Sequence, residues 1–144
     1  NGGSAAEAQH MSAEYLATLD HSKPRKGIKS MALTVDTSFL TAWTNDFGYE
    51  EVFSRQLETL GQEGDIFMAY STSGTSKNII KALTYASKSG IVTIGFTGND
   101  GGDLKKLCDV SFVVPSSSTA MIQEIHTMLG HEICQLVEES MAKK

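Results

Sequence analysis

Short runs of apolar residues, well separated along the chain, have the length of β-strands. The run Ile66–Tyr70 is unbroken, and similar runs cover Ile91–Phe96 and Val110–Val114. An unbroken apolar run is typical of a strand that is covered on both faces. A further candidate strand is Met31–Val35. The pattern therefore predicts a sheet with helices or loops packed on both of its faces.

Apolar residues recur at helical spacing between these runs. Ser4 and Glu7 form a capping-box pattern at the start of the first such segment, which is expected to end near Leu19. Thr37 is expected to cap the second segment, and Gly61 stands where the third should end. Helices are thus expected over 5–19, 39–43, 49–60, 79–89 and 104–107, and from Thr119 to the Lys143-Lys144 tail.

Strands and helices alternate along the whole chain, which favours an α/β fold with a doubly wound parallel sheet flanked by helices. No repeat or low-complexity linker divides residues 1–144, so a single domain is expected. Ligands of such folds bind where the carboxyl ends of the strands meet the loops and helix N-termini. Because the chain opens at Asn1 on a glycine turn that normally follows a strand, we expect it to lack its true N-terminus.

Composition and charge exclude several classes of protein. The 144 residues are 40% hydrophobic and 20% charged, as in an ordinary globular domain. The net charge of −5, without a basic patch, argues against a nucleic-acid partner. The apolar runs are far shorter than the ~20 residues that span a bilayer, so no membrane partner is expected. Cys108 and Cys134 lack CxxC spacing, which favours reduced thiols and a cytoplasmic location.

A loop rich in hydroxyl groups, Ser71-Thr72-Ser73-Gly74-Thr75-Ser76, follows the unbroken apolar run and precedes a helix. Free backbone N–H groups, a positive helix end and hydroxyl donors together make an anion site. No Gly-Lys-Ser/Thr follows, so this is not a Walker A loop. The alternative is a hydroxyl-rich turn in which Ser76 serves only as a helix cap. Five hydroxyls exceed what one cap needs, and they favour a phosphate site.

Histidine and oxygen ligands lie on one face of both the first and the last helix. His10 and Glu14 are four residues apart, and Gln123 and His131 are separated by two turns. Such pairs are commonly surface or packing residues. Brought together, they could form a metal site or an acid/base couple. His126 lies off this face and His21 in a loop, so both are interpreted as structural.

The segment Asn45-Asp46-Phe47-Gly48 is a candidate loop tip. Asp46 could accept sugar hydroxyls there, and an Asx turn that ends a helix is the alternative. Trp43, Tyr70 and Phe96 are interpreted as core or pocket wall.

Taken in order, these blocks resemble the phosphoheptose isomerases of the sugar isomerase (SIS) domain superfamily. The resemblance covers essentially the whole chain and implies a flavodoxin-like three-layer sandwich. It also implies that a further N-terminal helix and first strand of the family are missing here. It rests on Asn1-Gly2-Gly3-Ser4, His10, Glu14, segments 45–48 and 71–76, Thr97-Gly98, Gly101-Gly102, Ile122-Gln123-Glu124 and His131.

The resemblance implies interconversion of sedoheptulose 7-phosphate and D-glycero-D-manno-heptose 7-phosphate through an enediol, the first step toward the heptose of bacterial lipopolysaccharide core. By position, it makes Glu14 the base and His131 its acid partner. Phosphate contacts would come from Ser71, Thr72, Ser73 and Ser76, and sugar contacts from Asn1, Gly2, Gly3, Asn45, Asp46 and Gln123. Some members hold zinc on positions that match His10, Glu14, Gln123 and His131.

Two positions depart from the family pattern. Ala17-Thr18 stands where the family often has Gly-Arg, and Ala120 where some members have an acidic residue. These departures leave the phosphate or sugar contacts, and the heptose itself, open. The competing class is a non-catalytic SIS-domain adaptor that binds a replication initiator, or a sugar-phosphate sensor, which has no reason to keep both Glu14 and His131. A zinc hydrolase is a weaker alternative, since no His-rich zincin motif is present.

The first and last helices carry apolar residues on more of their circumference than one sheet contact needs. Examples are Met11, Tyr15, Met128 and Ile133. This pattern predicts a homo-oligomer. The resemblance implies a tetramer with D2 symmetry whose active sites are completed across subunit boundaries, so that His131 would face Glu14 of a neighbouring chain.

Overall fold

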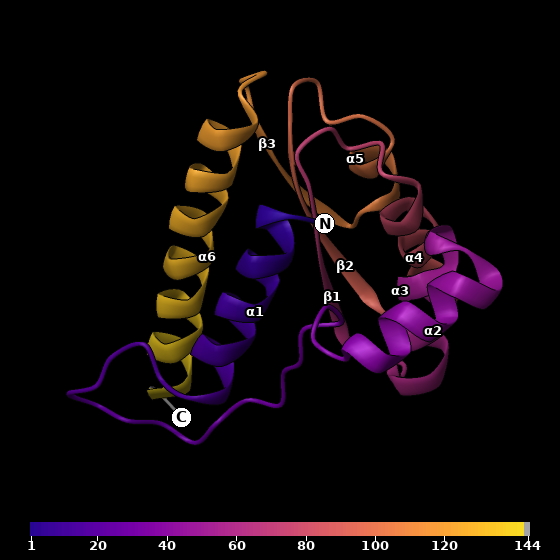
Figure 1. The fold of residues 1–144 in the computed structure, drawn as a ribbon. Coiled ribbons are helices and arrows are strands. Elements are labelled where there is room, and N and C mark those ends of the chain that lie inside the picture. Colours follow the sequence, from indigo (N-terminus) through magenta and orange to yellow (C-terminus); the bar gives the residue numbers. More distant parts are fainter. Residues whose placement is uncertain (143–144) are drawn as a thin grey trace.

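The computed structural model describes residues 1–142, and the Lys143-Lys144 tail lies outside the described residues. Helices and strands alternate as the sequence predicts (Figure 1). The elements are α1 (Gly3–Leu16), α2 (Thr37–Phe47), the 3-10 helix η1 (Tyr49–Glu51), α3 (Val52–Leu60), β1 (Ile66–Ser71), α4 (Lys77–Lys88), β2 (Val92–Gly98), α5 (Leu104–Leu107), β3 (Val110–Val114) and α6 (Thr119–Ala142).

Within the described residues the strands form one three-stranded parallel sheet in the order β1-β2-β3. The register pairs Ser71 with Thr97, and Gly98 with Val114. The carboxyl ends of all three strands therefore meet at one edge of the sheet. This is the edge at which a doubly wound fold binds its ligands.

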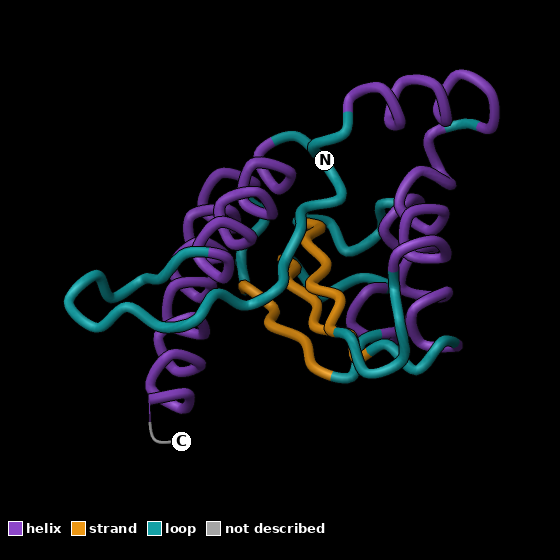
Figure 2. The backbone as a smooth tube through the Cα atoms, turned by 90° about the horizontal axis from the view of Figure 1, so that it is seen from below, coloured by secondary structure: helices purple, strands orange, loops and turns teal. Residues whose placement is uncertain are grey.

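Helices cover both faces of the sheet, so the predicted three-layer α/β architecture is confirmed (Figures 1 and 2). Ala69 of β1 packs into a core built with α3, α4 and α5, which includes Val52, Leu83 and Leu104. Its neighbour Tyr70 points to the opposite face and packs with Met11 and Phe96 under α1 and α6. Successive strand residues point to opposite faces, which explains the unbroken apolar run.

Helices α1 and α6 lie side by side and run in the same direction (Figure 1). A Cβ atom on Gly3 would collide with the amide of Gln123, and one on Gly130 would lie 3.2 Å from Glu7 Oε1. Further along, His10 meets His131. The two helices are therefore in contact along their length, because glycine on either side lets them approach closely.

The segment between α1 and α2 is irregular, and the predicted strand Met31–Val35 is wrong. No strand of the described residues pairs with it. Side chains satisfy its backbone instead: Gln56 Nε2 donates to the Leu33 carbonyl at 2.9 Å. A strand needs a partner ladder for these groups, and here helix α3 takes that place.

Several predicted helix ends also differ. Gly2, with φ +56°, precedes α1, and Ser4 and Glu7 are buried rather than forming a capping box. Helix α1 ends at Leu16 rather than Leu19. Asp36, not Thr37, caps α2 by accepting from the Phe39 amide at 2.9 Å. Inward-facing polar residues at a helix start imitate the capping pattern in sequence, and only packing distinguishes the two.

Candidate active site

The hydroxyl-rich loop leaves the carboxyl end of β1 and enters α4. Ser71 is buried, and its hydroxyl donates to Ser76 Oγ at 3.1 Å. At the exposed tip, the Thr75 amide donates to Ser73 Oγ at 3.2 Å. Ser76 occupies the N-cap position of α4 but makes no side-chain cap hydrogen bond. Ser76 Oγ therefore does not cap the helix. The Ile79 amide donates to the Ser76 carbonyl and to Asn78 Oδ1, so the amides of Lys77 and Asn78 are the donors that this helix start offers to an anion.

A second loop, which follows β2, is hydrogen-bonded to this first loop. The Gly98 amide donates to the Thr72 carbonyl at 3.0 Å, and the Leu104 amide donates to the Gly74 carbonyl at 3.0 Å. Gly74 has φ +68°, and a Cβ there would collide with the Gly101 carbonyl. Glycine is thus required at this point by both conformation and space. The two loops form one rigid unit at the carboxyl edge of the sheet.

Asn1 lies beside the start of α4. Its side chain and that of Asn78 exchange hydrogen bonds of 3.1 and 2.9 Å, and the Tyr49 hydroxyl donates to Asn1 Oδ1 at 2.6 Å. These residues surround an open pocket of about 320 Å³, lined by Asn1, Tyr49, Glu50, Ser76, Lys77 and Asn78. The Lys77 ammonium in this lining pairs with the Glu50 carboxylate at 3.0 Å. Amide, hydroxyl and paired charged groups around a pocket of this kind suit a polyhydroxylated ligand.

His10, Glu14 and His131 form a second cluster, between α1 and α6. His10 Nε2 lies 3.5 Å from Glu14 Oε1 and 3.3 Å from His131 Nε2. One ligand atom from each residue falls within 4.8 Å of the other two. The cluster is partly open to solvent, since the His10 side chain is 41% exposed. Two imidazoles and a carboxylate at these distances can exchange protons or hold a cation.

Two of the three separations in this cluster match those of a tetrahedral metal site. Zinc binds imidazole nitrogen at about 2.0–2.1 Å, so adjacent ligand atoms of a tetrahedral site lie about 3.3–3.4 Å apart. The two separations measured from His10 Nε2, 3.3 and 3.5 Å, match that spacing. Two nitrogens and one oxygen leave a fourth position for water or substrate, as in catalytic zinc sites.

A family model described as SIS domain matches residues 1–98. The phosphoheptose isomerase of Sulfurimonas denitrificans is 55% identical over 141 residues, which are 98% of this chain and 71% of that protein. The enzyme of Burkholderia pseudomallei strain K96243 is 51% identical over the whole chain and 72% of its own length. The chain belongs to the phosphoheptose isomerase family.

Solved structures of phosphoheptose isomerases have the same fold. The structure from Neisseria gonorrhoeae matches with a TM-score of 0.85 and 42% identity over 96% of this chain and 73% of that one. The structure from Francisella tularensis matches with a TM-score of 0.90 and 34% identity, with the same coverage.

The structure brings together some of the site residues expected for a phosphoheptose isomerase and separates others. His10, Glu14 and His131 of one chain meet, so the expected pairing of His131 with Glu14 of a neighbouring chain is not required. Gln123 lies against Gly3, about 12 Å along α6 from His131 at 1.5 Å per residue. Within one chain it is therefore not a member of the metal-ligand cluster.

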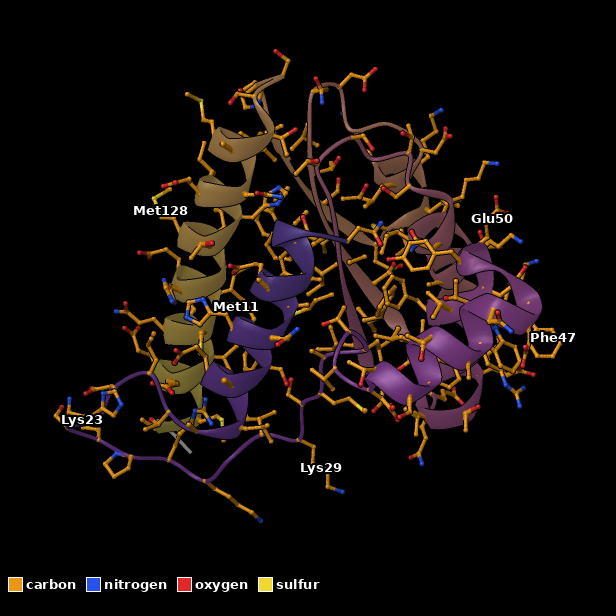
Figure 3. The ribbon with its side chains drawn as sticks, viewed as in Figure 1. Met11, Lys23, Lys29, Phe47, Glu50 and Met128 are labelled. Atoms are coloured by element: carbon orange, nitrogen blue, oxygen red, sulfur yellow. The ribbon has the colours of Figure 1, made fainter. Side chains whose placement is uncertain are left out.

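Asn45 and Asp46 lie in the last turn of α2, exposed and hydrogen-bonded to each other at 2.8 Å. They do not form the expected loop tip, which comes only at Gly48 with φ +89°. In Figure 3 the neighbouring Phe47 stands at the outer edge of the molecule. Asn45 and Asp46 do not line the pocket at Asn1, although Tyr49, which follows closely in sequence, does.

Sequence reasoning missed Tyr49, Asn78 and Glu7. Asn78 is buried beside Asn1, and Glu7 is buried with its Oε2 atom 3.8 Å from His10 Nδ1. Glu7 precedes His10 by one helical turn, and this spacing could have revealed it. No local pattern marks Tyr49, because its contact with Asn1 depends on how η1 sits against α4.

Among residues 1–142, no helix combines the length and the apolar character needed to cross a membrane. The cytoplasmic location expected from the sequence stays a prediction.

Proposed function

We propose that this protein is an aldose–ketose isomerase that interconverts sedoheptulose 7-phosphate and D-glycero-D-manno-heptose 7-phosphate. The contact of His10, Glu14 and His131 in one cluster is the observation that carries the proposal. Membership of the phosphoheptose isomerase family supports the substrate. A role early in the supply of heptose for lipopolysaccharide belongs to the same proposal.

In the proposed reaction, the Glu14 carboxylate removes a proton from the carbon beside the substrate carbonyl. His131 gives a proton to the carbonyl oxygen, and an enediol results. Glu14 then gives this proton to the former carbonyl carbon. His131 takes the hydroxyl proton from the carbon that Glu14 first deprotonated, and that carbon becomes the new carbonyl. Such a shift needs one group that accepts a carbon-bound proton and one that serves the oxygens, and the two lie on facing helices here.

The phosphate group would bind in the hydroxyl-rich loop. Ser71, Thr72, Ser73 and Ser76 lie between the end of β1 and the first turn of α4, where helix geometry favours an anion. Binding energy gained at this remote group orients the reacting carbons. Asn1 with Gly2 and Gly3 would line the sugar at the neighbouring pocket.

If a metal ion takes part, His10, Glu14 and His131 would hold it, with Gln123 as a ligand only after a rearrangement or from another chain. A bound zinc ion would polarise the substrate carbonyl. Glu14 has two oxygens, and Oε1 faces His10, so the other oxygen is left to accept the proton.

We also propose a homotetramer. Leu16 on α1 and Met121, Met128 and Leu136 on α6 are each more than half exposed. Figure 3 shows Met128 on the outer side of α6. In one chain, moreover, Asn1 precedes α1, and the helical stretch from Gly3 to His10 alone rises about 10 Å. This separation favours active sites in which the phosphate loop of one subunit serves the cluster of another.

A nuclear magnetic resonance assay tests the function. The purified protein is incubated with sedoheptulose 7-phosphate, and we expect the anomeric signals of the aldose phosphate to grow to a constant ratio. An adaptor or sensor would bind the sugar phosphate without converting it. No conversion by protein that binds the substrate, with and without added zinc, would overturn the proposal.

The assembly has a separate test. Light scattering should give the mass of four chains. After dissociation and reassociation, a mixture of the inactive Glu14→Gln protein with the weakly binding Ser73→Ala protein should be more active at low substrate concentration than the two proteins kept apart, because some sites then combine an intact phosphate loop with an intact Glu14. A fully active monomer would contradict the shared site.

A further inference from the structure

Glu7 is a buried carboxylate to which the reaction proposed above gives no role. It lies on α1, one turn before His10, and only 8% of its surface is exposed. The Thr127 hydroxyl of α6 donates to its Oε2 atom at 2.6 Å. The same oxygen faces His10 Nδ1 at 3.8 Å. A carboxylate is costly to bury unless its environment uses it, so this arrangement requires an explanation.

The other oxygen of Glu7 also needs an explanation. Glu7 Oε1 is fully buried and has no hydrogen-bond donor among the described residues. The Tyr70 hydroxyl, buried under α1, also has no partner in this part of the chain. Burial raises the pKa of the Tyr70 phenol, and the charge of Glu7 raises it further, so the phenol keeps its proton and can only seek an acceptor. A donor and an acceptor thus lie unpaired behind His10.

A carboxylate faces each ring nitrogen of His10, with Glu7 Oε2 3.8 Å from Nδ1 and Glu14 Oε1 3.5 Å from Nε2, so the role of His10 decides its tautomer. A neutral imidazole carries its proton on one nitrogen and accepts at the other. His10 Nε2 faces both His131 Nε2 and Glu14 Oε1. To bind a metal, or to accept a hydrogen bond from His131, His10 Nε2 must carry a lone pair. The proton then sits on Nδ1, which is the nitrogen that faces Glu7.

We propose that Glu7, held in place by the Thr127 hydroxyl, is a positioning residue that keeps the His10 proton on Nδ1 and leaves Nε2 free toward Glu14 and His131. Metal-bound histidines are commonly oriented by a carboxylate on the opposite ring nitrogen. In the metal-free protein, this arrangement leaves His131 Nε2 as the donor toward His10, which agrees with His131 as the proton carrier. This inference deepens the proposed function and rests on it.

The test reads the tautomer directly. Long-range proton–nitrogen spectra of the metal-free, ¹⁵N-labelled protein are recorded at mildly alkaline pH, where imidazole is neutral. The His10 signals are assigned by their loss in His10→Gln. We expect the Nδ1–H tautomer in the wild type and a shift toward Nε2–H in Glu7→Leu, which removes both charge and acceptor. Glu139→Gln changes an exposed carboxylate of α6 and serves as the control.

A second readout is the affinity for zinc alone, measured by competition with a chromophoric chelator. Glu7→Gln and Glu7→Leu should each weaken zinc binding by about 10–100-fold, and Glu139→Gln should not. A wild-type His10 with its proton on Nε2, or a tautomer unchanged in Glu7→Leu, would overturn the proposal, as would unchanged zinc affinity in both variants. The tautomer measurement decides even if a variant fails to fold or no zinc binds, and neither readout depends on isomerase activity.

Discussion

Replacing Arg25 with alanine should cost this protein more stability than any exposed ion pair could. Arg25 lies in the loop after α1, and its Nε atom is 2.9 Å from Glu138 Oε1, with both side chains at most 10% exposed. Its guanidinium also donates to the carbonyls of Glu14 and Tyr15 at 2.9 Å each. The Arg25 side chain therefore acts as a cap for the last carbonyls of α1 and links α1 to α6 through its ion pair with Glu138.

The expected loss in the free energy of unfolding depends on the hydrogen bonds that Glu138 keeps in Arg25→Ala. Breaking a buried ion pair by removing one partner costs about 3–5 kcal/mol. Glu138 would still accept from the amides of Leu19 and Asp20, at 2.7 and 3.0 Å, and from the Thr18 hydroxyl. These hydrogen bonds favour the lower end, about 3 kcal/mol. For a chain of this size, that loss corresponds to a fall in Tm of roughly 6–12 °C.

The matched control is Arg55→Ala. Arg55 pairs with Glu58 at 2.8 Å, but the two side chains are 42% and 55% exposed. An exposed pair contributes about 1 kcal/mol or less. Urea unfolding at equal protein concentration measures both variants. If Arg25→Ala loses no more stability than Arg55→Ala, then the buried pair does not fasten α1 to α6 as described.

Three further predictions concern the loop and the buried pair. Ser73→Ala should raise KM with little change in kcat, because a phosphate contact acts in the ground and transition states alike; an unchanged KM with a collapsed kcat would contradict this. Gly74→Ala should weaken substrate binding and stability, whereas Gly64→Ala, with a similar positive φ but open space around it, should only add backbone strain, as thermal melting and titration would show. Burial alone would raise the pKa of Glu138, but the Leu19 and Asp20 amides, the Thr18 hydroxyl and Arg25 together hold it below its ordinary value. Its stabilising effect is therefore complete above the unfolded pKa of about 4.3 and is lost as the pH falls through the folded pKa, so the stability difference from Glu138→Gln should shrink only in that acid range.

Elements that are defined by their own periodicity could be predicted from the sequence. The apolar run at 66–70 became β1, and the segment from Thr119 became α6. The hydroxyl-rich loop was also predicted, because its position between a buried strand and a helix fixes its place at the sheet edge. His10 and Glu14 share a helix face by spacing alone. The spacing of Gln123 and His131 on the last helix indicated His131 as a candidate, and the family resemblance gave it its role.

Features that depend on contacts distant in sequence could not be predicted. Met31–Val35 has the composition of a strand, but no ladder partner lies beside it in the described chain. Ser4 and Glu7 look like a cap, yet both are buried, and Glu7 faces α6. The buried pair of Arg25 and Glu138 joins residues 113 positions apart, as their numbering shows, and neither residue has a local signal.

The proposed reaction depends on the Glu14 carboxylate, which moves the proton between the two reacting carbons. The most direct measurement is kcat for sedoheptulose 7-phosphate in Glu14→Gln, beside the exposed carboxylate control Glu139→Gln. The change keeps the shape of the side chain and removes its basicity, so kcat should fall by about 10²–10⁴-fold while phosphate binding persists. A Glu14→Gln protein that keeps kcat within tenfold of the wild type, a loss of only about 1.4 kcal/mol, would contradict the account.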